Sequence, residues 1–213
     1  MYVVGQYTRV LNAHWKLLKS VVKKLFEFMH ESFEGVQDFA CETFMKISMK
    51  CSQSFVKVQE SENEAYLAEL VRTVYDNTKD LKQHQQLMFY EAIGNMIKEE
   101  YNLQQKIFYI KALMSDKHNQ WNQIFSQAKN NPIILNNVDI VKCLALIVHV
   151  NERVCYATKT TYWYYGSSIF PDMINSFIYF SNIINKHLND NKPIDVNTRT
   201  YILYNRTLIK FFT

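Results

Sequence analysis

Few residues in this 213-residue sequence have the types and spacing that catalysis or metal binding requires. His30-Glu31 begins like the helix of a zinc protease, but that motif needs a second histidine at position 34, which is Glu34. The other histidines are scattered, and the sequence contains no nucleophile elbow, phosphate-binding loop or dinucleotide fingerprint. We therefore expect no catalytic residue, no metal site and no cofactor.

Two charged clusters have ordinary structural explanations. Glu31, Glu34, Asp38 and Glu42 flank the start of an expected helix, where acidic side chains favour the positive end of the helix dipole. A basic set, Arg9, Lys16, Lys19, Lys23 and Lys24, is typical of a solvated helix face. Lys24 differs, because it lies one turn from Val21 and Phe28 in an apolar stripe. Its ammonium could there donate hydrogen bonds to the carbonyls of a ligand.

The scarcity of turn residues indicates an all-α fold. The chain has 4 glycines and 3 prolines, whereas hydrophobic residues make up 48% and aromatic residues 15% of it. Sheet-rich folds need glycine and proline for their turns, and a disordered chain would lack this apolar content. A helical globular or solenoid protein remains.

Apolar residues recur with a helical period along most of the chain. The spacing predicts helices over 10–30, 36–51, 64–77, 83–99, 103–130 with a break near 115–117, 138–156, 161–187 with a break at 166–171, and 197–212. These helices form successive pairs, which favours an α-solenoid of HEAT-like antiparallel pairs; a compact helical bundle is the alternative.

The first helix carries two apolar stripes. Core packing alone needs only one stripe on a surface helix. One stripe is Leu11, Trp15, Leu18, Val22, Leu25 and Met29, and the other is Val10, Leu17, Val21, Lys24 and Phe28. Two stripes indicate contacts on two sides of the helix, either with both neighbouring repeats or with a ligand.

Charge and cysteine usage narrow the class of protein. The net charge of +4 lacks the dense basic stripe of a nucleic-acid binder, and no apolar run is long enough to insert into a membrane. The N-terminus does not read as a signal peptide. We expect Cys41, Cys51, Cys143 and Cys155 to be buried and reduced in an intracellular protein.

Several stretches resemble the exportin-1 family of nuclear export receptors, in the importin-β superfamily. They are Met1-Tyr2-Val3-Val4-Gly5-Gln6-Tyr7, Ala13-His14-Trp15-Lys16, Lys24-Leu25-Phe26-Glu27-Phe28-Met29-His30-Glu31 and Gly35-Val36-Gln37-Asp38. The resemblance is specific over the first 51 residues and fades after about residue 157. It implies a central fragment of a HEAT-repeat receptor: residues 1–8 would end one repeat, and 10–51, 62–99, 102–156 and 159–213 would be helix pairs.

The resemblance also implies a binding site. In this family, a leucine-rich export signal binds a hydrophobic groove between the outer helices of two repeats, and the helix over 10–30 would form one wall. Lys24 would contact the backbone of the signal and select among peptides. The implied lining residues are Met1, Val10, Leu17, Ser20, Val21, Lys24, Leu25, Phe28 and Phe39.

Two residues depart from the family pattern. Relatives commonly have aromatic residues where this chain has Val10 and Leu17, so wider pockets are expected here. The partners implied are cargo proteins with export signals, Ran-GTP and nucleoporins, in a receptor that shuttles between nucleus and cytoplasm. A generic HEAT-repeat scaffold is the alternative function, and it would not need a lysine within an apolar stripe.

Overall fold

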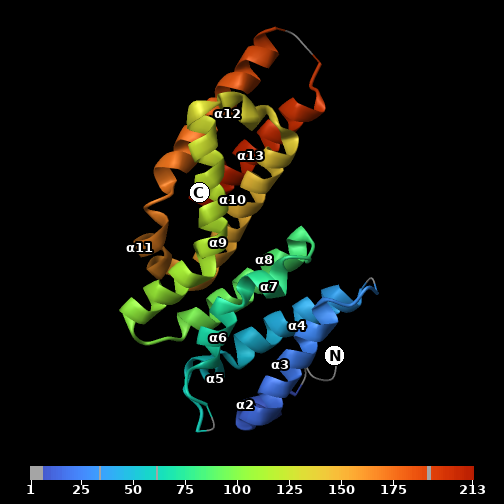
Figure 1. The fold of residues 1–213 in the computed structure, drawn as a ribbon, viewed down its shortest axis with the longest axis vertical. Coiled ribbons are helices and arrows are strands. Elements are labelled where there is room, and N and C mark those ends of the chain that lie inside the picture. The colour runs from blue at the N-terminus through green and yellow to red at the C-terminus, as the bar shows by residue number, and fades with distance from the viewer. Residues whose placement is uncertain (1–6, 34, 61, 191–192) are drawn as a thin grey trace. The chain divides into compact units, whose positions relative to one another are not determined.

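The computed structural model describes residues 7–33, 35–60, 62–190 and 193–213, and these contain helices without a β-strand (Figure 1). The α-helices are α2 (Thr8–Ala13), α3 (Trp15–Met29), α4 (Val36–Lys50), α5 (Ser52–Val56), α6 (Tyr66–Arg72), α7 (Val74–Thr78), α8 (Gln83–Lys98), α9 (Leu103–Asn130), α10 (Val138–Thr158), α11 (Trp163–Gly166), α12 (Phe170–Asn189) and α13 (Val196–Phe212). Two 3₁₀-helices, η1 (Pro132–Asn136) and η2 (Lys159–Tyr162), lie on either side of α10. The all-α prediction is confirmed, in a helical arrangement that fits an α-solenoid.

The chain forms two compact units. The first comprises residues 1–113 and 153–164, and the second comprises residues 114–152 and 165–213. The chain passes between them within α9, within α10 and within α11. The repeat boundaries expected above stay a prediction, and each unit is described here by itself.

The first unit is built on α3, α4 and α8, with α4 packed against both of the others. Its core contains an aromatic cluster in which the rings of Phe26, Phe44 and Phe89 lie 5.1–5.6 Å apart. The turn into α4 uses Gly35 at φ +88, a left-handed conformation that glycine adopts without strain. Gly94 lets α8 approach the end of α10 closely, since a Cβ there would lie 2.7 Å from the Cβ of Ala157.

The second unit packs α12 and α13 against the later part of α9 and the earlier part of α10. Trp121, Leu144, Phe180 and Tyr204 are among its fully buried side chains. One polar contact lies inside this core, where the hydroxyl oxygens of Ser176 and Tyr204 are 2.6 Å apart. Asp195 caps α13 by accepting a hydrogen bond of 2.7 Å from the backbone N–H of Thr198.

Three helix boundaries differ from the sequence prediction. The helix expected over 10–30 is interrupted at His14, which has φ −130 and ψ 87, and the helix expected over 64–77 is interrupted at Thr73. The break expected near 115–117 is absent, because Met114, Lys117 and Trp121 continue one buried face of α9. The break expected at 166–171 is confirmed.

Candidate functional site

One face of α3 belongs to the core of the first unit. Leu18, Val22, Leu25 and Met29 are each no more than 2% exposed. This is the first of the two stripes predicted from the sequence, and Leu11 of α2 continues it. Leu25 is buried on this inner face, and its expected place beside the pockets of the groove stays a prediction.

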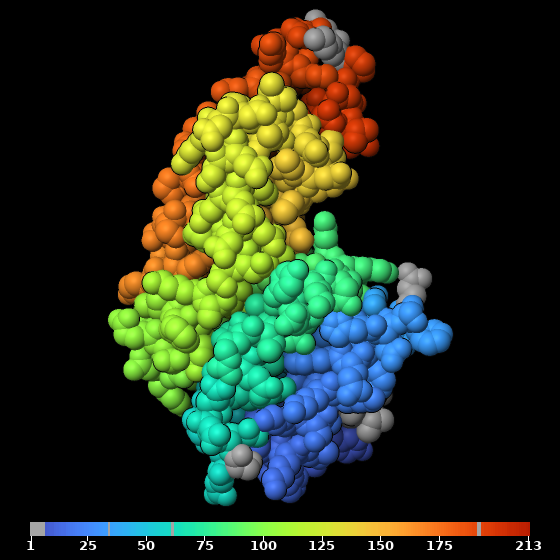
Figure 2. Space-filling model, viewed as in Figure 1, coloured from blue at the N-terminus to red at the C-terminus, as the bar shows by residue number. Residues whose placement is uncertain are grey.

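A second face of α2 and α3 leaves apolar side chains in contact with solvent. We define the outer stripe as Val10, Leu17, Val21, Lys24 and Phe28. Val10 is 46% and Leu17 45% exposed, while Val21 and Phe28 are half-buried. These two helices lie at the surface of the first unit, where they are blue in Figure 2. The outer stripe therefore offers apolar contact area that packing within the described residues does not cover.

Lys24 gives the outer stripe a cation with defined neighbours. Its Nζ lies 2.5 Å from the Glu27 carboxylate one turn away and 5.1 Å from the centre of the Phe28 ring. The hydrogen bond to Glu27 raises the pKa of Lys24. A fixed cation beside exposed aliphatic carbon can donate hydrogen bonds to a bound peptide.

The remaining expected lining residues differ in their surroundings. Ser20 is exposed, and its hydroxyl donates to the Lys16 carbonyl at 2.8 Å, within its own helix. Phe39, on α4, is 38% exposed. Met1 lies outside the described residues. The expected positions of Phe39 and Met1 at the floor of a groove stay predictions.

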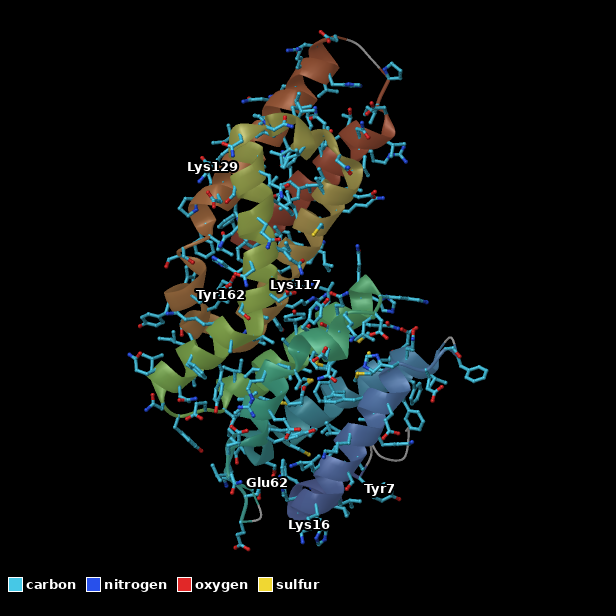
Figure 3. All side chains as sticks on the ribbon, viewed as in Figure 1. Tyr7, Lys16, Glu62, Lys117, Lys129 and Tyr162 are labelled. Atoms are coloured by element: carbon cyan, nitrogen blue, oxygen red, sulfur yellow. The ribbon has the colours of Figure 1, made fainter. Side chains whose placement is uncertain are left out.

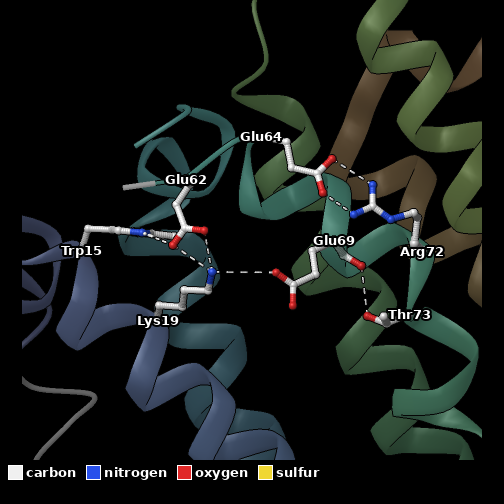
Figure 4. A network of polar contacts seen from close by, with 7 residues as sticks. All are labelled: Trp15, Lys19, Glu62, Glu64, Glu69, Arg72 and Thr73. Atoms are coloured by element: carbon white, nitrogen blue, oxygen red, sulfur yellow. Dashed lines mark hydrogen bonds and ion pairs between the residues drawn. The ribbon is translucent and has the colours of Figure 1, made fainter. Parts of the chain in front are cut away.

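A third face of α3 is held by polar contacts, which Figure 4 shows. Glu62 accepts hydrogen bonds from the Trp15 indole N–H at 3.1 Å and from Lys19 Nζ at 2.7 Å. Lys19 also lies 3.9 Å from the Glu69 carboxylate and 5.1 Å from the centre of the Tyr66 ring. Hydrogen bonds from Lys19 and Trp15 hold the pKa of Glu62 below its usual range.

An ion pair between Glu64 and Arg72 lies near Glu62 but does not contact α3. Arg72 donates to both carboxylate oxygens of Glu64 (Figure 4). The pair lowers the pKa of Glu64 and raises that of Arg72. The sequence pattern alone indicates no role for Glu62 or Glu64.

The four cysteines are free thiols with raised pKa values. Cys41 and Cys51 are buried as expected, whereas Cys143 and Cys155 are only half-buried. Burial, followed by the charges of Asp38 and Glu42, raises the pKa of Cys41 to about 12. Since the thiolate is the reactive form, these side chains are poorly suited to act as nucleophiles.

His30 and His84 each contact a carboxylate. His30 Nδ1 lies 2.8 Å from Asp80, and His84 Nε2 lies 2.7 Å from Asp38. Over residues 7–33, 35–60, 62–190 and 193–213, no three histidine, cysteine or acidic side chains gather closely enough to hold a metal ion. In the same ranges, no helix combines the length and apolarity that crossing a bilayer demands.

The hollows on the described surface include a polar one and an apolar one. A polar one of about 640 Å³ lies at the break between α2 and α3, lined by Ala13, His14, Trp15, Lys16, Gln59 and Glu60. An apolar one of about 280 Å³ lies between α12 and α13, lined by Ile174, Phe177, Leu208, Ile209, Phe212 and Thr213. Neither hollow holds a nucleophile beside a base.

Comparison with known proteins gives curated relatives but no matching family model. The chain is 42% identical over 193 residues to Protein EXPORTIN 1B of Arabidopsis thaliana, covering 91% of the chain and 18% of that protein. It is 43% identical over 185 residues to Exportin-1 of Drosophila melanogaster, covering 86% of the chain and 17% of that protein. Exportin-1 of Schizosaccharomyces pombe is 42% identical over 180 residues, covering 84% of the chain and 16% of that protein.

The chain thus spans less than a fifth of the length of these relatives. The shared region nevertheless includes most of this sequence, with a similar identity to a plant, an insect and a yeast protein. The chain is exportin-1-like over about nine tenths of its length.

Proposed function

We propose that this chain is part of a nuclear export receptor and that its outer stripe binds the leucine-rich export signals of cargo proteins. The observation that carries the proposal is the exposure of Leu17 on the same face of α3 as Lys24, together with the exposure of Val10 on α2. The likeness to proteins named exportin-1 supports it.

The chemistry of the outer stripe suits such a peptide. An amphipathic helix with spaced Leu, Ile, Val or Phe anchors lays its apolar face on a hydrophobic surface. Burying each anchor is worth about 1.5–3 kcal/mol before the ordering cost is subtracted. The half-buried Val21 and Phe28 extend this surface along α3, and the Lys24 ammonium can donate to carbonyls of the peptide backbone.

By resemblance, the proposal extends to the intact receptor. There, Ran in its GTP state would favour binding of cargo, nucleoporins would be partners during passage through the pore, and the receptor would shuttle between nucleus and cytoplasm. A transport receptor of this kind catalyses no covalent step, which agrees with the expectation of a protein that is not an enzyme. Direct binding of nucleic acid or insertion into a membrane forms no part of this proposal.

A titration of the isotopically labelled chain with a synthetic leucine-rich export peptide tests the proposal by NMR, which detects weak complexes. We expect the largest shifts at Val10, Leu17, Val21 and Phe28. A peptide whose anchors are replaced by serine is the control, and it should cause no shifts. Shifts confined to residues outside α2, α3 and α4 would contradict the assignment of the outer stripe.

A further inference from the structure

The outer stripe crosses a break in the backbone. Val10 lies on α2, whereas Leu17, Val21 and Phe28 lie on α3, and His14 between the two helices is not helical. A helix of 6 residues such as α2 is too short to be stable by itself. The direction of α2, and with it the position of Val10 relative to Leu17, must therefore be fixed by contacts with other segments.

The segment that runs from Cys51 to Glu62 provides contacts to α2. The Cys51 thiol lies 3.6 Å from the carbonyl oxygen of Thr8, and the Ser54 hydroxyl donates to the side-chain oxygen of Asn12 at 2.5 Å. These contacts hold the first and the last turn of α2. The buried side chain of Leu11 packs beneath the same helix.

The same segment holds the first turn of α3. Besides Glu62, which accepts from Trp15 and Lys19, the ring of Phe55 contacts Trp15 edge-on, with ring centres 6.2 Å apart. Tyr66 contacts the indole from another side at 5.7 Å. Glu62 and Lys16 lie at the same end of the first unit, as Figure 3 shows.

We propose that the segment 51–62 is a clamp that sets the angle between α2 and α3, and that Glu62 is a positioning residue that acts through Trp15 on the partner-binding surface. This inference rests on the proposed function, since the angle matters because it spaces the apolar anchors of the outer stripe. The apolar anchors of a helical peptide have a fixed spacing, which the apolar side chains of the outer stripe must match. A different angle between α2 and α3 would therefore move Val10 away from the peptide side chain that it should contact.

The groups that face Glu62 make this clamp sensitive to acid. On α3 they are Trp15, Lys19 and Lys23, and on α6 they are Tyr66 and Glu69. Glu60 and Glu64 are the nearest acidic residues before and after Glu62 in the sequence. The carboxylate form of Glu62 is favoured in the folded chain. Its contribution is thus complete above the ordinary pKa of a glutamate and is lost as the pH falls through the lower pKa of the folded state.

The test compares Glu62→Gln with Glu64→Gln in the full chain. Glu64 follows Glu62 by two residues but pairs with Arg72, so it is a matched control that leaves α3 untouched. Residual dipolar couplings of α2 and α3 report the angle between the helices, and the indole N–H signal of Trp15 reports its hydrogen bond. Binding of the export peptide is measured on the same samples.

We expect Glu62→Gln to change the angle between α2 and α3, to move the Trp15 indole signal and to lower the affinity for the export peptide about three- to tenfold. Glu64→Gln should change none of the three. Trp15→Phe removes the indole N–H but keeps an aromatic ring, and it should reproduce the change of angle. An acid titration should move the Trp15 signal in the parent chain but not in Glu62→Gln.

Each failure has its own signature. An unchanged angle in both Glu62→Gln and Trp15→Phe would overturn the clamp, whatever the peptide does. A changed angle with unchanged peptide affinity would overturn the positioning role of Glu62. If the parent chain binds no export peptide, the proposed function fails instead, and the dipolar couplings still decide whether segment 51–62 sets the angle.

Discussion

The outer stripe of the first unit and the apolar pocket between α12 and α13 of the second unit are both exposed apolar surfaces, yet they differ in their polar groups. Lys24 lies within the outer stripe and is held by Glu27 and Phe28. The lining of the α12–α13 pocket contains no charged side chain. A surface with a fixed cation can recognise a peptide backbone, whereas an apolar hollow by itself recognises only shape.

The largest expected effect separates these two surfaces. Leu17→Asp should weaken binding of an export peptide about 10- to 100-fold, because burying an aliphatic anchor is worth about 1.5–3 kcal/mol. Ile209→Asp, in the α12–α13 pocket, should leave the affinity unchanged. Both residues are about half exposed, so neither change should unfold the chain. Fluorescence polarisation with a labelled peptide measures both, and equal losses would remove the distinction.

A second experiment compares the internal packing of the first unit with that of the second. Gly94→Ala places a methyl group against Ala157 and should cost the first unit about 1–3 kcal/mol. Ser176→Ala removes the partner of the buried Tyr204 hydroxyl and should cost the second unit a similar amount.

Amide hydrogen exchange measures these two losses unit by unit, because local opening need not involve the whole chain. Gly94→Ala should lower protection mainly in α8, and Ser176→Ala mainly in α12 and α13. Gln83→Ala, at an exposed position of α8, is the control. Equal loss of protection in both units from either change would mean that they unfold as one body.

A smaller effect is expected from Lys24→Ala, and it concerns selectivity. A donor fixed in the outer stripe selects peptides by their backbone geometry, so its loss should change the ranking of a peptide panel more than the affinity of the best peptide. Parallel titrations of both chains with the same panel provide the measurement. An identical ranking with identical affinities would show that Lys24 does not contact the ligand.

The smallest expected effect is a pH dependence in the second unit. Burial lowers the pKa of His118, which lies 3.2 Å from the Tyr165 hydroxyl. The unfolded chain therefore binds the proton more readily as the pH falls below the ordinary histidine value of about 6.5. Stability should decline from that value down to the lowered pKa and then level off. Denaturant unfolding of His118→Gln should show less of this decline.

The sequence predicts the helices and the inner face of α3 well, because both follow from the helical period of apolar residues. Leu18, Val22 and Met29 are buried as that period requires. The period also separates Val10 and Leu17 from the core, which the structure confirms by their exposure.

Other features depend on contacts between distant residues, which no local pattern reveals. The break at His14 adjoins the contact of Trp15 with Glu62, 47 positions away. The helix continues through 115–117 because Lys117 is buried, and this burial lowers the pKa of its ammonium group. From the sequence alone, a lysine at this position would be expected at the surface. Leu25 was expected in the groove from the resemblance, although its own position in the apolar period had already placed it in the core.

The contact between Lys24 and Glu27 has a consequence for the thermodynamics of recognition. A peptide carbonyl that reaches the ammonium enters an exchange reaction, since Glu27 already occupies it. The net enthalpy gained is then small, and an acidic peptide must compete with an anion of the protein's own. Added salt screens the attraction of the ammonium to Glu27 and to an acidic peptide, but it affects a neutral carbonyl less. The ionic strength therefore decides whether Lys24 selects peptides mainly by their charge or mainly by the position of their backbone carbonyls.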